Sequence, residues 1–231
     1  MISAVIKNIT QATPTIKTLR LEPQGEFSFK AGQWIDFYVD LSGERKVAGY
    51  SMTSSPLTRG YFDLAVKKVG ENPVTKHIHS EAREGEVVHV DGGYGEIFYE
   101  VGTARSVFLI AGGIGIAPHM SIFRYVNEGD QEASATLIYS ASNPSELVFR
   151  EEIESITRNN SRMRAFLTVT DETEGWSGHA GKIDSDLIRE AGIDSEALCY
   201  ICGPPQMIHE LVNMLRGFGI RRKQMRYELW W

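Results

Sequence analysis

The sequence has few cysteines and no long apolar run. Two cysteines, Cys199 and Cys202, are too few to hold an iron–sulfur cluster, which takes four thiolates. The longest apolar stretch, Val107–Ala117, has eleven residues and is interrupted by glycines, so we expect no membrane span. The first residues lack the charged and then apolar regions of a signal peptide, and we therefore expect a cytoplasmic protein.

Positive charge is also scarce. The chain has 24 Lys and Arg against 30 Asp and Glu, a net charge of −6, which argues against nucleic acid as a partner. The six histidines have no metal-ligand spacing and no hydrolase motif is present, so we expect no metal site and no hydrolase. With 231 residues, 42% of them hydrophobic, the chain is long enough for one large or two small globular domains.

The two cysteines form a C-x-x-C pair, a spacing found in redox and metal sites. The segment Leu198–Cys202 predicts a strand, however, and residues three apart in a strand point to opposite faces. We therefore expect the two thiols not to meet, which leaves a separate role for Cys202 open.

A glycine-rich turn follows the most apolar part of the chain. Val107–Ala111 predicts a strand buried on both faces, and Gly112, Gly113 and Gly115 lead into a helix predicted over 116–126. This arrangement directs free backbone N–H groups at one point, which suits a phosphate or diphosphate. The spacing matches neither G-x-x-x-x-G-K-[ST] nor G-x-G-x-x-G, so tight packing alone is an open alternative for this turn.

The first hundred residues alternate between apolar and polar side chains. This alternation predicts strands over 15–22, 34–40, 49–54, 62–69 and 86–91, with one helix over 74–82. Asn72 is placed to cap that helix. The pattern predicts an antiparallel β-barrel.

From about residue 103 the predicted strands alternate with helices. Strands are expected over 107–111, 135–140, 164–170, 198–202 and 224–230, with helices beginning near 116, 146, 184 and 205. This alternation predicts a doubly wound parallel sheet, whose ligands bind beyond the carboxyl ends of the strands. We therefore expect a β plus α/β protein with domains over 1–102 and 103–231.

Four ordered motifs resemble the ferredoxin–NADP reductase superfamily. They are Tyr50-Ser51 after a barrel strand, Gly-Gly-Ile-Gly-Ile-Ala-Pro over 112–118, Cys-Gly-Pro-Pro over 202–205, and a C-terminal Glu-x-aromatic. The resemblance covers nearly the whole chain. It implies a barrel that binds FAD, a second domain that binds NADH or NADPH, and hydride transfer between the two rings at the domain interface.

The resemblance also implies flavin contacts in the first domain. Tyr50 resembles the aromatic residue that packs against the flavin, and Ser51 resembles the hydroxyl that hydrogen-bonds near flavin N5. Further contacts are implied for Met52, Thr53, Val66, Lys67, Val74 and Thr75. A core tyrosine at position 50 and a solvated lysine at position 67 are the alternatives.

In the second domain the resemblance implies a nicotinamide site. Cys202 resembles the residue that supports the nicotinamide, Glu228 the carboxylate that tunes proton supply, and Trp230 the aromatic that covers the flavin. With Ser51, the first two are the expected catalytic residues. The remaining expected cofactor contacts are Gly113, Ile114, Gly115, Ala117, Pro118, Ser140, Ser142, Gly203 and Pro204.

Two positions depart from the family pattern. Ala48 stands where the family usually has the arginine of Arg-x-Tyr-Ser, so a bidentate phosphate ligand is missing and FAD is expected to be weakly held. Lys46, on the same strand face, is a partial substitute. Ser142 stands where NADP-preferring members usually have arginine; Arg150, Arg162 and Arg164 are the possible substitutes, which leaves NADH or NADPH open.

These features predict an NAD(P)H-dependent flavin oxidoreductase that passes electrons from FAD to a separate acceptor, which is either a protein or a small molecule. The alternative is a flavin reductase that uses FMN, FAD or riboflavin as a diffusible substrate, and Ala48 favours it. A third alternative, from another class, is a non-catalytic nucleotide-binding module.

Overall fold

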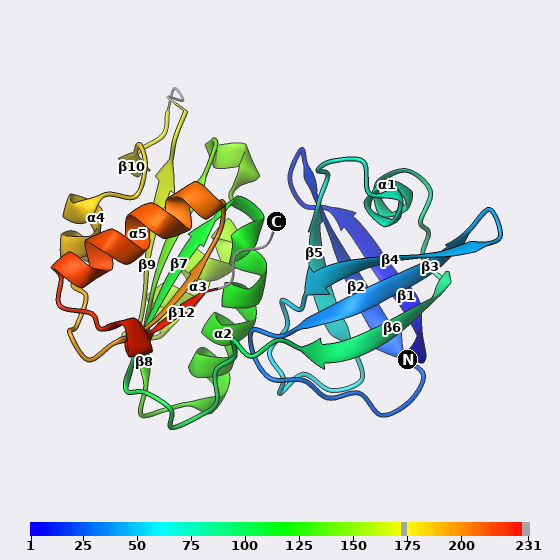
Figure 1. Cartoon of the computed structure of the whole chain (residues 1–231), viewed down its shortest axis with the longest axis horizontal. Helices are drawn as coiled ribbons and strands as arrows, with labels where there is room; N and C mark the ends of the chain where they lie inside the picture. Colours follow the sequence, from blue (N-terminus) through cyan, green and yellow to red (C-terminus); the bar gives the residue numbers. More distant parts are fainter. Residues whose placement is uncertain (172–174, 228–231) are drawn as a thin grey trace.

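The computed structural model describes residues 1–171 and 175–227, and it consists of two lobes, each built on a six-stranded sheet (Figure 1). The first lobe is antiparallel and the second is parallel and covered by helices. The predicted fold class is therefore confirmed.

The first sheet has the strand order β4-β3-β6-β1-β2-β5. In β3 (Trp34–Leu41), Ile35, Phe37 and Val39 are buried in the core of this lobe, as their alternation predicts. Met52 and Leu64 form an antiparallel bridge, so the two edge strands meet at one end. The other strands and the helix of this lobe are β1 (Ile2–Gln11), β2 (Ile16–Pro23), β4 (Glu44–Ser51), β5 (Phe62–Lys67), β6 (Val87–Tyr94) and α1 (Pro73–Ser80).

The parallel sheet of the second lobe has the strand order β10-β9-β8-β7-β11-β12. Helices α2 and α3 cover one face and α4 and α5 the other, with a separate apolar cluster on each face (Figure 1). The strands are β7 (Ser106–Gly112), β8 (Ser134–Ala141), β9 (Met163–Val169), β10 (His179–Ala180), β11 (Leu198–Cys202) and β12 (Met225–Tyr227). The helices are α2 (Ile116–Gly129), α3 (Arg150–Asn159), α4 (Ser185–Ala191) and α5 (Pro205–Gly217).

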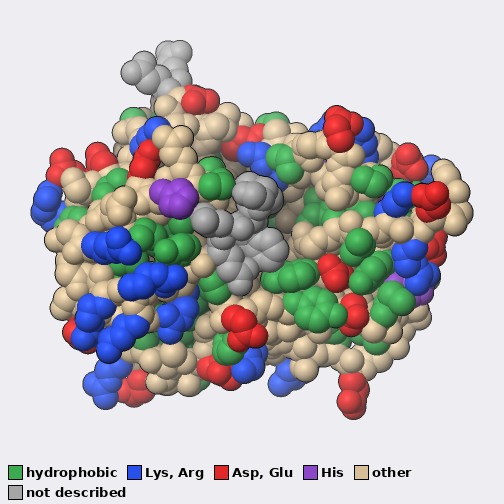
Figure 2. Space-filling model, viewed as in Figure 1, with side chains coloured by type: hydrophobic (Ala, Val, Ile, Leu, Met, Phe, Trp, Pro, Cys, Tyr) green, Lys and Arg blue, Asp and Glu red, His purple; other side chains and the backbone are tan. Residues whose placement is uncertain are grey.

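Lys and Arg side chains gather on the second lobe over α5 and the turn that follows it (Figure 2). This region contains the exposed residues Arg216, Arg221, Arg222 and Lys223. The molecule thus has a basic surface although its net charge is −6.

The junction between the lobes is packed as one continuous core. Ala31 and Tyr99 of the first lobe belong to the same apolar cluster as Ile116 and Met120 of α2. Tyr200 Oη, at the middle of β11, donates a hydrogen bond of 2.8 Å to the Phe98 carbonyl. The division that we place between residues 102 and 103 falls in the connection between Tyr99 and β7, and it stays a prediction.

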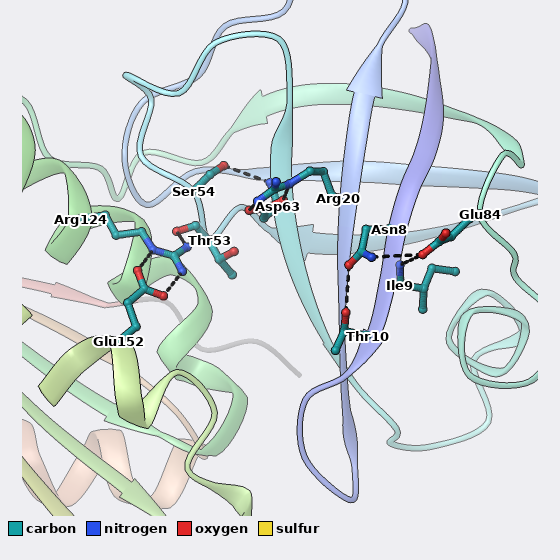
Figure 3. A network of polar contacts seen from close by, with 10 residues as sticks. All are labelled: Asn8, Ile9, Thr10, Arg20, Thr53, Ser54, Asp63, Glu84, Arg124 and Glu152. Atoms are coloured by element: carbon teal, nitrogen blue, oxygen red, sulfur yellow. Dashed lines mark hydrogen bonds and ion pairs between the residues drawn. The ribbon is translucent and has the colours of Figure 1, made fainter. Parts of the chain in front are cut away.

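Helix α2 is also bound to the backbone of the first lobe. Arg124 Nη1 donates to the Thr53 carbonyl at 2.6 Å while its guanidinium forms a two-bond ion pair with Glu152 of α3 (Figure 3). Ser121 Oγ donates to the Ser54 carbonyl at 2.7 Å. Within the described ranges, no helix has both the length and the apolar character that crossing a membrane requires.

Candidate functional site

A cavity at the junction brings Ser51 and Cys202 together. Ser51 ends β4 in the first lobe, Cys202 ends β11 in the second, and Pro118 lies in the first turn of α2; all three line the cavity. The other lining residues are Gly32, Trp34, Gly95, Ile97, His119, Ile122, Tyr200 and Ile201. Residues expected to contact the flavin and the nicotinamide thus face one space between the two lobes.

The two cysteines have separate environments, as predicted from the strand period. Cys199 is buried in the apolar cluster under α4 and α5, and burial raises the pKa of its thiol to about 12. Cys202 is partly exposed and lines the junction cavity. The described part of the chain has no group of three or more His, Cys, Asp or Glu side chains placed to hold a metal.

Ser51 and Thr53 have hydroxyl groups that have no hydrogen-bond partner among the described residues. Thr53 Oγ1 is fully buried and has no hydrogen-bond partner, and the Ser51 hydroxyl makes no hydrogen bond to any described residue. Buried polar atoms are usually paired, so a ligand that supplies hydrogen-bonding atoms fits this segment. Of the two residues, only Ser51 lines the junction cavity, where its hydroxyl can face such a ligand.

The first turn of α1 has no free backbone donor. Asn72 Oδ1 accepts hydrogen bonds from the N–H groups of Val74 and Thr75, at 2.9 and 3.3 Å, and the Asn72 carbonyl accepts from Lys76. Pro73 has no N–H. A diphosphate expected at this turn would have to displace the Asn72 side chain. Thr75 Oγ1 is also engaged, in a hydrogen bond of 2.8 Å with Tyr50 Oη.

The strand face next to Tyr50 has no arginine. Ala48 packs against the core of the first lobe, and Lys46, two residues further out, forms an ion pair with Glu44. The expected substitute for the missing guanidinium thus has a carboxylate partner of its own. This part of the site therefore has little positive charge with which to bind a flavin phosphate.

The glycine loop that precedes α2 faces a lysine of the first lobe. Gly113 has φ of +54°, which favours glycine, and the only atom close to the position of a Cβ is Lys67 Nζ at 3.9 Å. Lys67 forms no hydrogen bond or ion pair with the described residues. Free space and an unpaired cation at such a loop fit the diphosphate of a dinucleotide. Lys67, assigned to the flavin by the resemblance, therefore also faces the nucleotide loop.

Gly115 and Gly203 allow two loops to approach each other. A Cβ on Gly115 would lie 2.9 Å from the Gly203 nitrogen and collide with the Cys202 carbonyl. A Cβ on Gly203 would lie 3.1 Å from the Gly112 nitrogen and collide with Met207. The two loops therefore approach so closely that both glycines are required for packing.

Several other expected contacts are core residues. Met52, Val66 and Val74 are buried in the core of the first lobe, so their side chains are unavailable to a ligand, and the Val66 carbonyl is hydrogen-bonded to His79 at 3.0 Å. Their remaining backbone atoms are the groups that can face a cofactor. In the second lobe, Ala117 and Ser140 are buried and Ile114 packs against the core. Ser142 is exposed, and Pro204 is the N-cap residue of α5. Glu228, Trp230 and Trp231 lie outside the described residues.

Arg162 and Arg164 lie at the amino end of β9, opposite the ligand edge of the sheet. Arg162 donates to the carbonyls of Asp130 and Ala133, and Arg164 donates to the carbonyl of Ala191. Neither guanidinium is near Ser142, which follows the carboxyl end of β8. Of the three arginines proposed as substitutes, only Arg150 is on the correct side.

The sequence alone did not identify Trp34, His119 and Tyr200 as cavity residues. Trp34 and Tyr200 lie in strands where aromatic residues are ordinary core residues. His119 had a detectable signal, because it is a lone polar ring among the apolar residues at the start of α2.

The chain matches two family models. An oxidoreductase FAD-binding domain matches residues 4–99, and an oxidoreductase NAD-binding domain matches residues 109–212. Oxidoreductase NAD-binding domain-containing protein 1 of Xenopus laevis is 32% identical over 253 residues, covering 99% of this chain and 79% of the relative.

Two further proteins are similar to the chain. NADH-cytochrome b5 reductase 1 of Ajellomyces capsulatus is 29% identical, and the match covers 83% of this chain and 64% of that protein. The FAD/NAD-binding domain of a nitric oxide dioxygenase from Vibrio cholerae superposes with a TM-score of 0.87 at 20% identity, covering 99% and 98% of the two chains.

Proposed function

Because the chain belongs to the ferredoxin–NADP reductase-like family of oxidoreductases, with an FAD-binding and an NAD-binding domain, we propose that it transfers a hydride from NADH to FAD and passes the electrons to a separate acceptor. One observation carries this proposal: Ser51 and Cys202, from different lobes, line the same cavity. A bound flavin supplies two-electron chemistry towards nicotinamide and one-electron chemistry towards an acceptor.

The protein's contribution is to position and enclose the reacting rings. Ser51, whose hydroxyl makes no hydrogen bond to a described residue, would hydrogen-bond the flavin, and Cys202 would support the nicotinamide from the opposite lobe. The hydrogen bond from Arg124 to the Thr53 carbonyl joins the two lobes, and the ion pair with Glu152 orients the guanidinium for it. The resemblance implies a carboxylate role for Glu228 and a flavin contact for Trp230, both of which lie outside the described residues.

NADH is the proposed donor. Its diphosphate binds at Gly113 and is neutralised by Lys67. NADPH would add a phosphate near the exposed Ser142. Arg150, the proposed substitute on this side of the sheet, already forms an ion pair with Glu154. NADH-cytochrome b5 reductase 1, a relative of this chain, bears the same donor in its name.

The proposed acceptor is a protein with an acidic surface that takes up one electron at a time. The exposed cations over α5, shown in Figure 2, are complementary to such a surface, and only Arg221 among them has an ion-pair partner, Glu196, in the described part of the chain. The acceptor would thus be a separate electron carrier. This agrees with the sequence, whose two cysteines are too few to hold an iron–sulfur cluster in this chain.

A second candidate function is the reduction of free flavin. Ala48 in place of arginine and the occupied first turn of α1 both weaken the binding of flavin phosphates. A flavin that dissociates readily is a substrate, and FMN or riboflavin would serve as well as FAD.

The experiment measures the dissociation constants of FAD, FMN and riboflavin by flavin fluorescence, and NADH oxidation with each. A retained cofactor predicts a yellow protein that binds FAD more tightly than riboflavin; the second candidate predicts similar affinities and turnover of all three. A protein that binds none of them would contradict both functions.

The variant Ala48→Arg tests the phosphate position directly. We expect FAD and FMN to bind about tenfold or more tightly, since a charge-assisted hydrogen bond contributes about 1.5–3 kcal/mol. Riboflavin, which has no phosphate, should bind as it does to the wild type. Ala48→Gln adds a long side chain without charge and is the matched control. Equal gains for all three flavins would show that position 48 does not face the phosphate.

A further inference from the structure

His119 is a buried histidine that the proposed function does not use. It follows Pro118 in the first turns of α2, is 2% exposed, and lines the junction cavity. Its Nδ1 atom is enclosed and has no hydrogen-bond partner, and neither ring nitrogen is bonded to any residue in the described ranges. Because buried polar groups are normally paired, an imidazole in a cavity that has no partner among the described residues indicates a ligand.

The ring is neutral and presents one donor. Burial lowers the pKa of His119 to about 3, so one nitrogen has the proton and the other has a lone pair. An enclosed N–H without an acceptor is rarer in proteins than an under-satisfied acceptor, which favours a lone pair on Nδ1. The proton is then on Nε2, and His119 offers a hydrogen bond donor.

The surroundings of His119 indicate what accepts this hydrogen bond. Ser51 and Cys202 line the same cavity, and these residues are the proposed contacts of the flavin and the nicotinamide. Both rings have uncharged carbonyl oxygens, which are suitable acceptors for a neutral N–H. His119 also lies in the first turns of α2, about one helical turn after the glycine loop that is proposed to bind the dinucleotide.

We infer that His119 donates a hydrogen bond from Nε2 to a ring carbonyl at the domain junction, and that it is thereby a binding residue for one of the two redox rings. The carbonyl is the carboxamide oxygen of nicotinamide or a carbonyl of the flavin. The inference rests on the proposed function and adds a ligand contact from α2 to those of Ser51 and Cys202.

The test combines His119→Leu with ligands altered at the carbonyl. Binding of NAD⁺ to the FAD-loaded protein is measured by calorimetry, beside acetylpyridine adenine dinucleotide, which keeps the carbonyl, and thionicotinamide adenine dinucleotide, whose sulfur is a poorer acceptor. We expect His119→Leu to bind NAD⁺ and the acetylpyridine analogue about three- to tenfold more weakly, which corresponds to the loss of one hydrogen bond. Its affinity for the thionicotinamide analogue should fall less than about twofold. If only FAD affinity falls, and the affinity for 4-thio-FAD falls less, the flavin carbonyl is the acceptor.

Two variants separate a lost hydrogen bond from altered packing. Met120→Leu changes a buried residue of the same helix that does not line the cavity, removes no polar atom, and should leave all affinities within about twofold of the wild type. His119→Gln keeps a side-chain N–H donor and should restore part of the lost affinity. The ¹⁵N resonances of the His119 ring give an independent readout, because they should shift on addition of the ring that accepts the hydrogen bond.

The inference is overturned if His119→Leu binds every ligand as the wild type does; His119 is then a packing residue, or its partner is an internal water. Failure of the proposed function has a different signature, because the wild type itself would then bind neither flavin nor dinucleotide.

Discussion

At the scale of the single residue, His119 makes stability depend on pH. Its pKa is about 3 in the folded protein against an ordinary value of 6.5, so between these values the unfolded chain binds more protons than the folded one. Stability is therefore lost as pH falls below about 6.5. We predict that the free energy of unfolding of the wild type, relative to that of His119→Leu, falls by about 1.4 kcal/mol per pH unit between about pH 6 and pH 4. Urea denaturation of both proteins across this range measures the difference, and parallel curves would contradict the prediction.

Lys67 gives a second prediction at this scale. Its ammonium group has no ion-pair partner among the described residues and faces the loop at Gly113. Lys67→Met should therefore raise the dissociation constant of NAD⁺ about tenfold at low salt, with a smaller effect at high salt. The next residue, Lys68, follows the end of β5 and is exposed, and Lys68→Met is the matched control. Equal effects of the two substitutions would indicate a general effect of charge.

Single-residue predictions succeeded where the strand period decided them. The opposite environments of Cys199 and Cys202 follow from alternation alone. The packing roles of Gly115 and Gly203 did not follow, because they depend on the approach of two loops that are far apart in the sequence. The cavity positions of Trp34 and His119 likewise depend on how the two lobes dock.

At the scale of the element, Asp130 fixes the end of α2. Its carboxylate accepts hydrogen bonds from Tyr99 Oη at 2.6 Å and from three backbone N–H groups. Burial alone would raise the pKa of Asp130, but these hydrogen bonds outweigh it and hold the pKa below its ordinary value of 3.8.

Asp130→Asn should therefore destabilise the protein at neutral pH, by about 1–3 kcal/mol, because the charged acceptor is lost. The contribution of the carboxylate is fully present above about pH 4 and is lost as pH falls through the lower pKa of the folded state. The difference between the two proteins should thus shrink in acid, which thermal unfolding at pH 7 and pH 3 measures. A constant difference would show that the charge of Asp130 is unimportant.

The N-terminus of α1 gives a prediction on flavin affinity. Removing the cap in Asn72→Ala should cost about 1 kcal/mol of stability. It also frees the two N–H groups that Asn72 now occupies, so FAD should bind at least as tightly as before, provided its diphosphate lies at this turn. Calorimetric unfolding and FAD titration measure the two effects. Weaker FAD binding would mean that Asn72 itself is a ligand.

The elements were predicted best where an apolar pattern marks them. Strands β3, β7, β8 and β11 and helices α2 and α5 lie within a few residues of the expected ranges. The prediction for β4 began at Gly49, but the strand begins at Glu44, because its charged first half pairs with β3 at the edge of the sheet. Strand β1 was not predicted. Helix α3 begins at Arg150 and not near Glu146, because Phe149 has φ of +64° and separates it from the 3₁₀ turn 144–146.

At the scale of the whole molecule, Arg124 holds the lobes together. Arg124→Ala removes the hydrogen bond to the Thr53 carbonyl and leaves Glu152 unpaired (Figure 3). We predict a loss of about 1–3 kcal/mol in stability and slower hydride transfer, with FAD and NADH affinities largely kept. Stopped-flow reduction of the flavin measures the rate. Arg150→Ala breaks an ion pair within α3 and is the control. Equal rates in both variants would show that this contact does not set ring alignment.

The predicted organisation into a β lobe and an α/β lobe was correct, but the contacts between the lobes were not predicted. Glu146, for example, is a buried carboxylate in the second lobe that accepts hydrogen bonds from Thr13 and Thr15 of the first. A charged residue in a turn gives no sign in the sequence of a partner 133 residues away. Such contacts between the lobes are determined by the surfaces of both folded lobes, which the sequence alone does not reveal.

Helix α2 begins at the nucleotide loop, lines the junction cavity, and is hydrogen-bonded to the flavin-side backbone through Ser121 and Arg124. One rigid element thus contacts both proposed cofactor sites. Thermodynamic reciprocity then applies: whatever factor bound FAD imposes on the affinity for the dinucleotide, the dinucleotide imposes on the affinity for FAD. In a cell, the fraction of this protein that holds its flavin therefore depends on the supply of nicotinamide dinucleotide wherever that factor differs from one.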